Sequence, residues 1–299
     1  MGHKKVFKNR QLIWGYFFIM PGILYLLLFC LGPILFSLIV SFTEWDVIRP
    51  MQFIGLKNYE RMLRDPLIAQ SLKVTAKYTL ITVPALNVVT FFVAILLNAE
   101  IRGISFYRTV FYMPSIIPVI ANSALWMFLY NPMYGMLNNI MRAIGMQPVA
   151  FLYNKSTVIP ALAVMQIWMS GNTMVIYLAG LKGIPNHLYE AIEIDGGSSF
   201  HKLLYVTIPM MSPIIFYNVV MSIITCMQTF AQAYIMTEGG PDNASLFYVL
   251  HLYRMAFKNQ QMGYASAMSW VLFVIICLLT AFLFRVSRDL VYYESGDSV

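Results

Sequence analysis

Six long apolar stretches are the feature that most constrains what this chain can fold into. Each is long enough for the roughly 20 residues that a membrane-spanning helix needs. Only 11% of the residues are charged, whereas a soluble globular protein carries about 25%. The sequence therefore predicts an all-α polytopic membrane protein with six transmembrane helices. The stretches lie near residues 13–41, 76–98, 109–130, 157–181, 208–236 and 264–284.

Basic residues around the first stretch predict its orientation. Residues 1–10 contain four Lys or Arg side chains, whereas residues 42–48 contain none. Because cytoplasmic flanks are enriched in cations, we expect the N-terminus in the cytoplasm, and six spans return the C-terminus to the same side. The first stretch is too long for a signal-peptide core, so we expect it to be retained in the cell membrane.

The residue types inside the spans exclude several kinds of membrane protein. No span interior contains Asp, Glu, Lys, Arg or His, although ion-coupled transporters carry such relays. The sequence contains no P-loop for ATP and neither an HExxH nor a GxSxG motif. Cys30, Cys226 and Cys277 lie in apolar stretches without metal-ligand spacing. We therefore expect no catalytic residue, cofactor or metal in this chain, and we attribute the net charge of +7 to anionic lipids, not nucleic acid.

Uncharged amides and aromatic rings do occur within the spans. A neutral polyhydroxylated ligand needs amide donors and acceptors, and rings cover the apolar faces of a sugar. The alternative is hydrogen bonding between helices, worth about 1 kcal/mol per residue. For the set we favour a translocation path, with Gln228 and Gln232 as the strongest pair because they lie one helical turn apart. The candidates are Asn122, Trp126, Gln166, Trp168, Asn172, Gln228, Gln232 and Tyr234.

One polar segment, residues 185–209, separates the fourth and fifth spans. Pro185 suits a first helical turn, and a Gly pair that begins at Gly196 is expected to end the helix. A short amphipathic helix of this kind lies on the membrane or docks into a partner protein, and we favour the partner. Its apolar face, formed by Leu188, Ala191 and Ile192, is expected to be buried in that partner.

The same segment carries a recognisable motif. Glu190-Ala191-Ile192, Gly196 and Pro209 resemble the EAA-loop signature of permease subunits in binding-protein-dependent ABC importers. That signature reads Glu-Ala-Ala, then Gly at its seventh position, then Ile-x-Leu-Pro at its end. This chain has Ile192 at the third position, with Val206 and Ile208 near the end. All three departures replace one apolar residue with another, so the expected docking is unaffected.

Further segments resemble the carbohydrate-uptake branch of that family, the maltose, glycerol-phosphate and oligosaccharide type. They are Phe53 to Tyr59, Thr237-Glu238-Gly239-Gly240-Pro241 and residues 263–267. The resemblance implies a type I ABC importer permease fold with a cytoplasmic coupling helix between helices 4 and 5. It implies three parts: residues 1–75 with the N-terminal tail, first helix and outside loop, residues 76–288 as the core permease domain, and residues 289–299 as a cytoplasmic tail.

The resemblance also implies partners. These are a second homologous permease subunit, two cytoplasmic ATPase subunits that bind ATP and Mg, and an extracytoplasmic sugar-binding protein, all at the lipid bilayer. Glu190 would pair with a basic residue of an ATPase subunit. The residues implied in ATPase coupling are Leu188, Tyr189, Glu190, Ala191, Ile192, Asp195, Gly196 and Pro209. The candidates for contact with the binding protein are Gly239, Gly240 and Pro241.

The predicted function is therefore half of the membrane pathway of an ATP-driven sugar importer, with an oligosaccharide as the expected cargo. A stand-alone channel or facilitator for neutral polyols is the alternative. It explains the uncharged spans but not the acidic helical loop. An intramembrane enzyme is a third possibility, which lacks a polar catalytic constellation. Phosphate-bearing substrates are disfavoured, because no cation lies among the candidate path residues.

Overall fold

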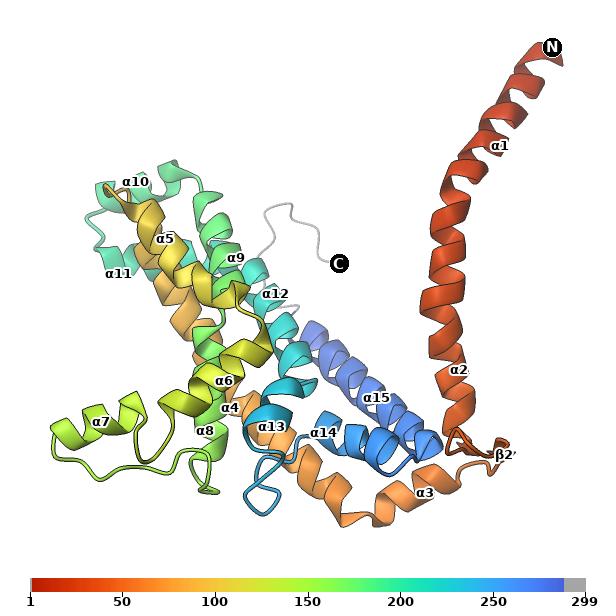
Figure 1. Cartoon of the computed structure of the whole chain (residues 1–299). Coiled ribbons are helices and arrows are strands. Elements are labelled where there is room, and N and C mark those ends of the chain that lie inside the picture. Colours follow the sequence, from red (N-terminus) through yellow and green to blue (C-terminus); the bar gives the residue numbers. More distant parts are fainter. Residues whose placement is uncertain (1, 288–299) are drawn as a thin grey trace. The chain divides into compact units, whose positions relative to one another are not determined.

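The computed structural model describes residues 2–287, so the predicted tail at 289–299 lies outside the described residues (Figure 1). The chain forms two compact units. The first contains Met1–Arg64 and Leu252–Phe273, and the second contains Asp65–His251 and Val274–Val299. The first unit thus recruits a late segment of the chain, which a division into consecutive domains does not anticipate.

The first unit begins with a long, continuous helical segment, which is apolar from Trp14 onward. Helix α1 (Gly2–Tyr25), a π-helical turn η1 (Leu26–Leu31) and α2 (Gly32–Ser41) follow one another without a break. A short hairpin comes next, in which β1 (Thr43–Glu44) and β2 (Gln52–Phe53) pair antiparallel, with Thr43 opposite Phe53. Helix α3 (Lys57–Arg64), the π-helical turn η4 (Arg254–Lys258) and the first half of α15 (Met262–Ser287) complete this unit.

The second unit is arranged around α4 (Pro66–Leu97), which packs against α8, α9 and α12. Asp65 caps this helix by accepting a hydrogen bond from the backbone N–H of Leu67, which satisfies one of the orphan donors of the first turn. The other elements of the unit are α5 (Ile104–Tyr112), η2 (Met113–Ile116), α6 (Val119–Leu129), α7 (Met136–Ala143), α8 (Val158–Trp168), α9 (Gly171–Lys182), α10 (Asn186–Ile194), α11 (Ser199–Lys202), η3 (Leu203–Thr207), α12 (Ile208–Met227), α13 (Ala231–Met236), the part of α14 (Tyr248–Tyr253) up to His251, and the second half of α15.

Among the described residues, four helices are long and apolar enough to cross a membrane: Trp14–Ser41, Pro66–Leu97, Ser199–Met227 and Met262–Ser287. Two further spans are bent pairs. Ile104–Ile116 and Val119–Leu129 meet at 100°, and Val158–Trp168 and Gly171–Lys182 meet at 49°. The total is six when each pair counts as one span. The predicted all-α, multi-pass architecture is confirmed.

The sharper bend has a local cause in the sequence. Pro118 has no backbone N–H to donate, and its ring pushes the preceding residue out of the helical region. Ile117 accordingly has a ψ of 127°, and the new helix α6 starts just after Pro118. The third apolar stretch therefore forms two helical pieces instead of one straight helix.

Polar side chains run along the buried face of α4 and bond to its neighbours. Thr75 Oγ1 accepts from the backbone N–H of Tyr248 at 2.9 Å. The hydroxyl of Tyr177 on α9 donates to Asn87 Oδ1 at 2.7 Å. Asn87 Nδ2 donates in turn to Val83 O at 2.8 Å. We call this row of buried polar groups the α4 seam. It ties α4 to helices that lie far from it in the sequence.

The α4 seam yields a stability prediction. Replacing Asn87 with Leu leaves the buried Tyr177 hydroxyl without its acceptor, which costs about 1–3 kcal/mol. We expect the purified complex to denature at a lower temperature in a thermal scan. The control is the double variant Asn87→Leu, Tyr177→Phe, which removes both partners and should regain most of the loss. A double variant no more stable than the single one would contradict the assignment.

Candidate functional site

Helix α10 stands where the sequence predicts the coupling helix, and its ends form as expected. Pro185 precedes the first turn, and Leu188 N–H donates to Pro185 O. At the other end Gly196 has a φ of +77°, in the left-handed region that favours glycine. Gly196 N–H donates to Glu193 O, and the next N–H, of Gly197, donates to Ile192 O at 2.8 Å. This pair of bonds is a Schellman motif, so the prediction that Gly196 ends the helix is confirmed.

The faces of α10 differ from the sequence expectation. Leu188, Tyr189 and Ile192 pack against the second unit's own apolar cluster, which includes residues of α4, α9 and α12. Only Ala191 of the predicted docking face is exposed. Leu188 and Ile192 are therefore only partly buried by the chain's own apolar surface, and burial of the rest of this face in a partner stays a prediction. The outward face carries His187, Glu190, Ala191, Ile194 and Asp195.

Polar contacts also fasten the coupling segment to the next long helix, α12. The hydroxyls of Tyr189 and Thr207 lie 3.1 Å apart. The ammonium of Lys202 forms an ion pair with Glu193. Pro209 lies in the first turn of α12, where its missing N–H leaves no donor unsatisfied. Helix α10 is thus attached to α11 and η3, the segments that lead into α12.

Two of the predicted path residues meet at a cavity within the second unit. Trp126 of α6 and Trp168 of α8 both line this cavity, which has a volume of about 380 Å³. Their rings lie edge to face, with centroids 5.7 Å apart. Apolar side chains and the hydroxyls of Thr90 and Ser170 supply other parts of the lining. We call this cavity the tryptophan cavity.

Asn122 lies one helical turn before Trp126 on α6 and is fully buried. Its Nδ2 and Oδ1, and Nε1 of Trp126, have no hydrogen-bond partner among the described residues. An unsatisfied buried polar group costs about 1–3 kcal/mol. These atoms therefore gain most from a water molecule or a ligand hydroxyl, which makes Asn122 and Trp126 the strongest path candidates.

The remaining path candidates are arranged differently from the prediction. Helix α12 ends at Met227, and Gln228 is its C-cap, whereas Gln232 belongs to α13. The expectation that the two glutamines share a helical face is wrong, because the backbone at Phe230 leaves the helical region, with φ −137° and ψ −63°. Gln228 is exposed and Gln232 is buried.

Gln232 is engaged in packing. Its Nε2 donates to the hydroxyl of Tyr78 at 2.9 Å and to Oε1 of Gln166 at 3.3 Å. Asn172 is exposed at the start of α9 and does not line the tryptophan cavity. The ring of Tyr234 stacks on Phe230, with centroids 5.4 Å apart. The sequence singled out these amides as polar groups within the spans but did not reveal which of them bond to one another.

The Gly-Gly-Pro loop is a tightly bonded turn. Ser245 Oγ bonds to Thr237 Oγ1 at 2.7 Å and to Gly240 O. Gly239 is buried, whereas Gly240 and Pro241 are partly exposed. Next in the chain, Asp242 forms an exposed ion pair with Lys155 at 2.8 Å. Sequence reasoning missed that pair, which lowers the pKa of the Asp242 carboxyl through the hydrogen bond and charge of Lys155.

Comparison with known proteins decides the family. Residues 78–292 match the family of binding-protein-dependent transport system inner membrane components. The chain belongs to this family. A stand-alone facilitator, the alternative left open by the sequence, is not supported.

The permease has close relatives over nearly its full length. The probable ABC transporter permease protein YesP of Bacillus subtilis is 40% identical over 288 residues, which are 95% of this chain and 93% of that protein. The lactose transport system permease protein LacF of Rhizobium radiobacter is 31% identical over 284 residues, 92% of this chain and 94% of that protein.

A solved structure agrees with the fold. A chain of a bacterial ABC transporter that imports the acidic polysaccharide alginate matches with a TM-score of 0.84 at 20% sequence identity. The match covers 95% of this chain and 99% of that chain. The permease therefore has the type I ABC importer permease fold and is a multi-pass membrane protein.

The two glutamines of the permease should behave differently on substitution. Gln232→Leu removes the donor to Tyr78 and Gln166, so we expect it to lower the denaturation temperature and the yield of the complex. Gln228→Leu is the matched control, since its side chain has no hydrogen bond among the described residues, and we expect stability to stay unchanged. Equal effects of the two variants in a thermal scan would contradict this assignment.

Proposed function

We propose that this permease forms half of the translocation pathway of an ATP-driven carbohydrate importer, with an oligosaccharide as cargo. Helix α10 is the observation that carries the proposal. One face of it is fixed to the chain's own core and the other presents Glu190 to solvent. Such a helix is suited to transmit force from a separate ATPase.

The tryptophan cavity supports the sugar class. Indole rings cover apolar sugar faces, and Thr90 and Ser170 add hydroxyl-bearing side chains to the lining. The naming of the relative LacF for lactose transport points the same way. The described parts of the spans contain no charged side chain that lines this cavity. A neutral sugar fits this lining better than a phosphate-bearing substrate.

The proposal includes an assembly that supplies the energy. A second homologous permease completes the pathway, two cytoplasmic ATPase subunits bind ATP and Mg, and an extracytoplasmic binding protein delivers the sugar. The termini of the permease lie in the cytoplasm, on the side of α10. Closure of the ATPase pair moves α10, and the contacts of Tyr189 with Thr207 and of Lys202 with Glu193 carry that movement to α12.

Reversing the charge at Glu190 tests the docking surface. We expect Glu190→Lys to weaken co-purification of the ATPase and sugar uptake by about tenfold or more, equivalent to about 1.4 kcal/mol. The reason is that Glu190 is exposed on the outward face and pairs with a cation of the ATPase. Glu60→Lys, an equal charge change on exposed α3, is the control and should leave docking intact. Undiminished co-purification of Glu190→Lys would refute the docking surface.

Dependence on partners tests the energy source. Liposomes that contain only this chain should show no flux of lactose or glycerol. Liposomes with the second permease, the ATPase, the binding protein and ATP should accumulate the sugar, because the chain itself offers no titratable relay or nucleotide site. Flux through the chain alone would overturn the importer proposal.

A further inference from the structure

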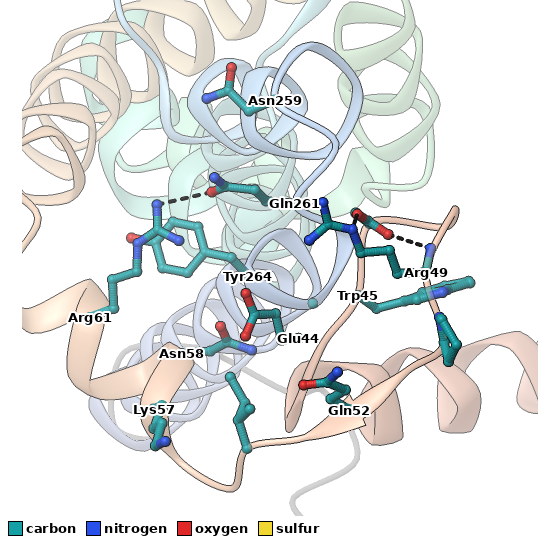
Figure 2. Close-up of a pocket in the computed structure, with 14 residues that line it drawn as sticks. Glu44, Trp45, Arg49, Gln52, Lys57, Asn58, Arg61, Asn259, Gln261 and Tyr264 are labelled. Carbon is teal, nitrogen blue, oxygen red and sulfur yellow. Dashed lines mark hydrogen bonds and ion pairs between the residues drawn. The ribbon is translucent and has the colours of Figure 1, made fainter.

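A second cavity lies entirely within the first unit (Figure 2). It has a volume of about 540 Å³, within the range of about 300–1,000 Å³ that is usual for small-molecule sites. Its walls come from the β-hairpin, from α3 and from the turn that leads into α15. We call it the outer pocket, because it lies where the chain leaves its first span, on the side opposite the N-terminus.

Backbone contacts hold the walls of the outer pocket in place. Asn58 of α3 is buried and donates to Ser41 O and Thr43 O, both at 2.9 Å. Gly263 N–H donates to Trp45 O at 3.3 Å. A Cβ at Gly263 would collide with Thr43 O, so only glycine permits this close approach. The hairpin is thereby joined to α3 and to the start of α15.

The cationic side chain of Arg61 in the pocket lining is also held in place by contacts within the first unit. The Arg61 guanidinium lies 4.2 Å from the ring centre of Tyr264. It also donates to Gln261 Oε1 at 2.9 Å, as Figure 2 shows. A guanidinium has five N–H donors, so several of them stay available for a ligand. The pocket is therefore organised before anything binds to it.

Three further lining side chains are exposed and have no hydrogen bond or ion pair among the described residues: Glu44, Gln52 and Lys57. Figure 2 shows Glu44 near the middle of the lining residues. The set combines a carboxylate that only accepts, an ammonium that only donates and an amide that does both. Trp45 adds a partly exposed ring, which lies edge to face with Phe36 at 6.0 Å.

These groups discriminate between ligand classes. A phosphate or carboxylate would be repelled by Glu44 and Asp46, and a cation would be repelled by Arg49, Lys57 and Arg61. A neutral polyhydroxylated ligand satisfies both kinds of group, since each hydroxyl donates and accepts. The Trp45 ring offers an apolar surface for a sugar face. The chemistry of the pocket thus favours an uncharged sugar.

We propose that the outer pocket is a saccharide-binding subsite, which takes one or two neutral sugar units. The proposal rests on the proposed function for the sugar class, but it concerns residues of the first unit alone. It assigns Glu44, Gln52, Lys57 and Arg61 as hydrogen-bonding groups to sugar hydroxyls and Trp45 as the stacking surface.

The test follows Trp45 directly. The assembled importer is labelled with 5-fluorotryptophan, and the fluorine resonance of Trp45, one of five tryptophans in the sequence, is assigned with Trp45→Phe. Lactose, maltose and trehalose are the probes, added without binding protein. We expect a saturable shift of the Trp45 resonance, with an apparent Kd that rises at least fivefold in Glu44→Gln and in Lys57→Met.

Glu60→Gln and Arg64→Met are matched controls, since they remove the same charges on α3 outside the pocket lining, and should leave the Kd unchanged. A Trp45 resonance that responds to none of the probes, or equally in pocket and control variants, overturns the subsite. A response only to glycerol phosphate overturns it in favour of an anion or lipid head-group site. Shifts at Trp126 or Trp168 without one at Trp45 would refute the subsite but leave the proposed function standing. A responsive Trp45 in an importer that takes up no sugar would refute the proposed function but support the subsite.

Discussion

The α4 seam is the constraint on which the second unit depends. Inside a bilayer no water competes for a polar group, so each one must find a partner in the protein. Helix α4 places its buried polar side chains against residues that come 90 to 173 positions later in the chain. Tyr78 meets Gln232, Asn87 meets Tyr177 and Thr75 meets the backbone of Tyr248. Non-directional apolar packing alone would not fix these helices in one register.

The same seam explains why a polar residue in a span is an ambiguous signal. Gln232 and Asn122 look equivalent in the sequence, since both are amides within apolar stretches. In the structure the Gln232 amide donates to two partners, whereas the Asn122 amide has none among the described residues. Only the arrangement of neighbouring helices separates an amide that holds the fold together from one that has no partner among the described residues.

Features that depend on local forces could be predicted from the sequence. Span number and type depend on length and hydropathy, and the end of α10 depends on Gly196, so both were predictable. The break between α12 and α13 carries no proline, so the departure of the backbone at Phe230 from the helix has no local signal in the sequence. The inward face of α10 packs against a cluster that includes Ala94 and Met211, which are remote in sequence, so this packing could not be predicted.

The packing of one face of α10 against the chain's own core limits which of its residues can contribute to the free energy of docking. An exposed ion pair contributes about 0–1 kcal/mol, so Glu190 alone cannot hold an ATPase. Ile194 is 86% exposed on the same outward side, and burying an isoleucine side chain contributes about 1.5–3 kcal/mol. Leu188 and Ile192 are already partly packed against the core, so docking would bury less additional apolar surface at these two residues. In the proposed docking to an ATPase, Ile194 therefore supplies the larger share of the affinity, and Glu190 sets the register.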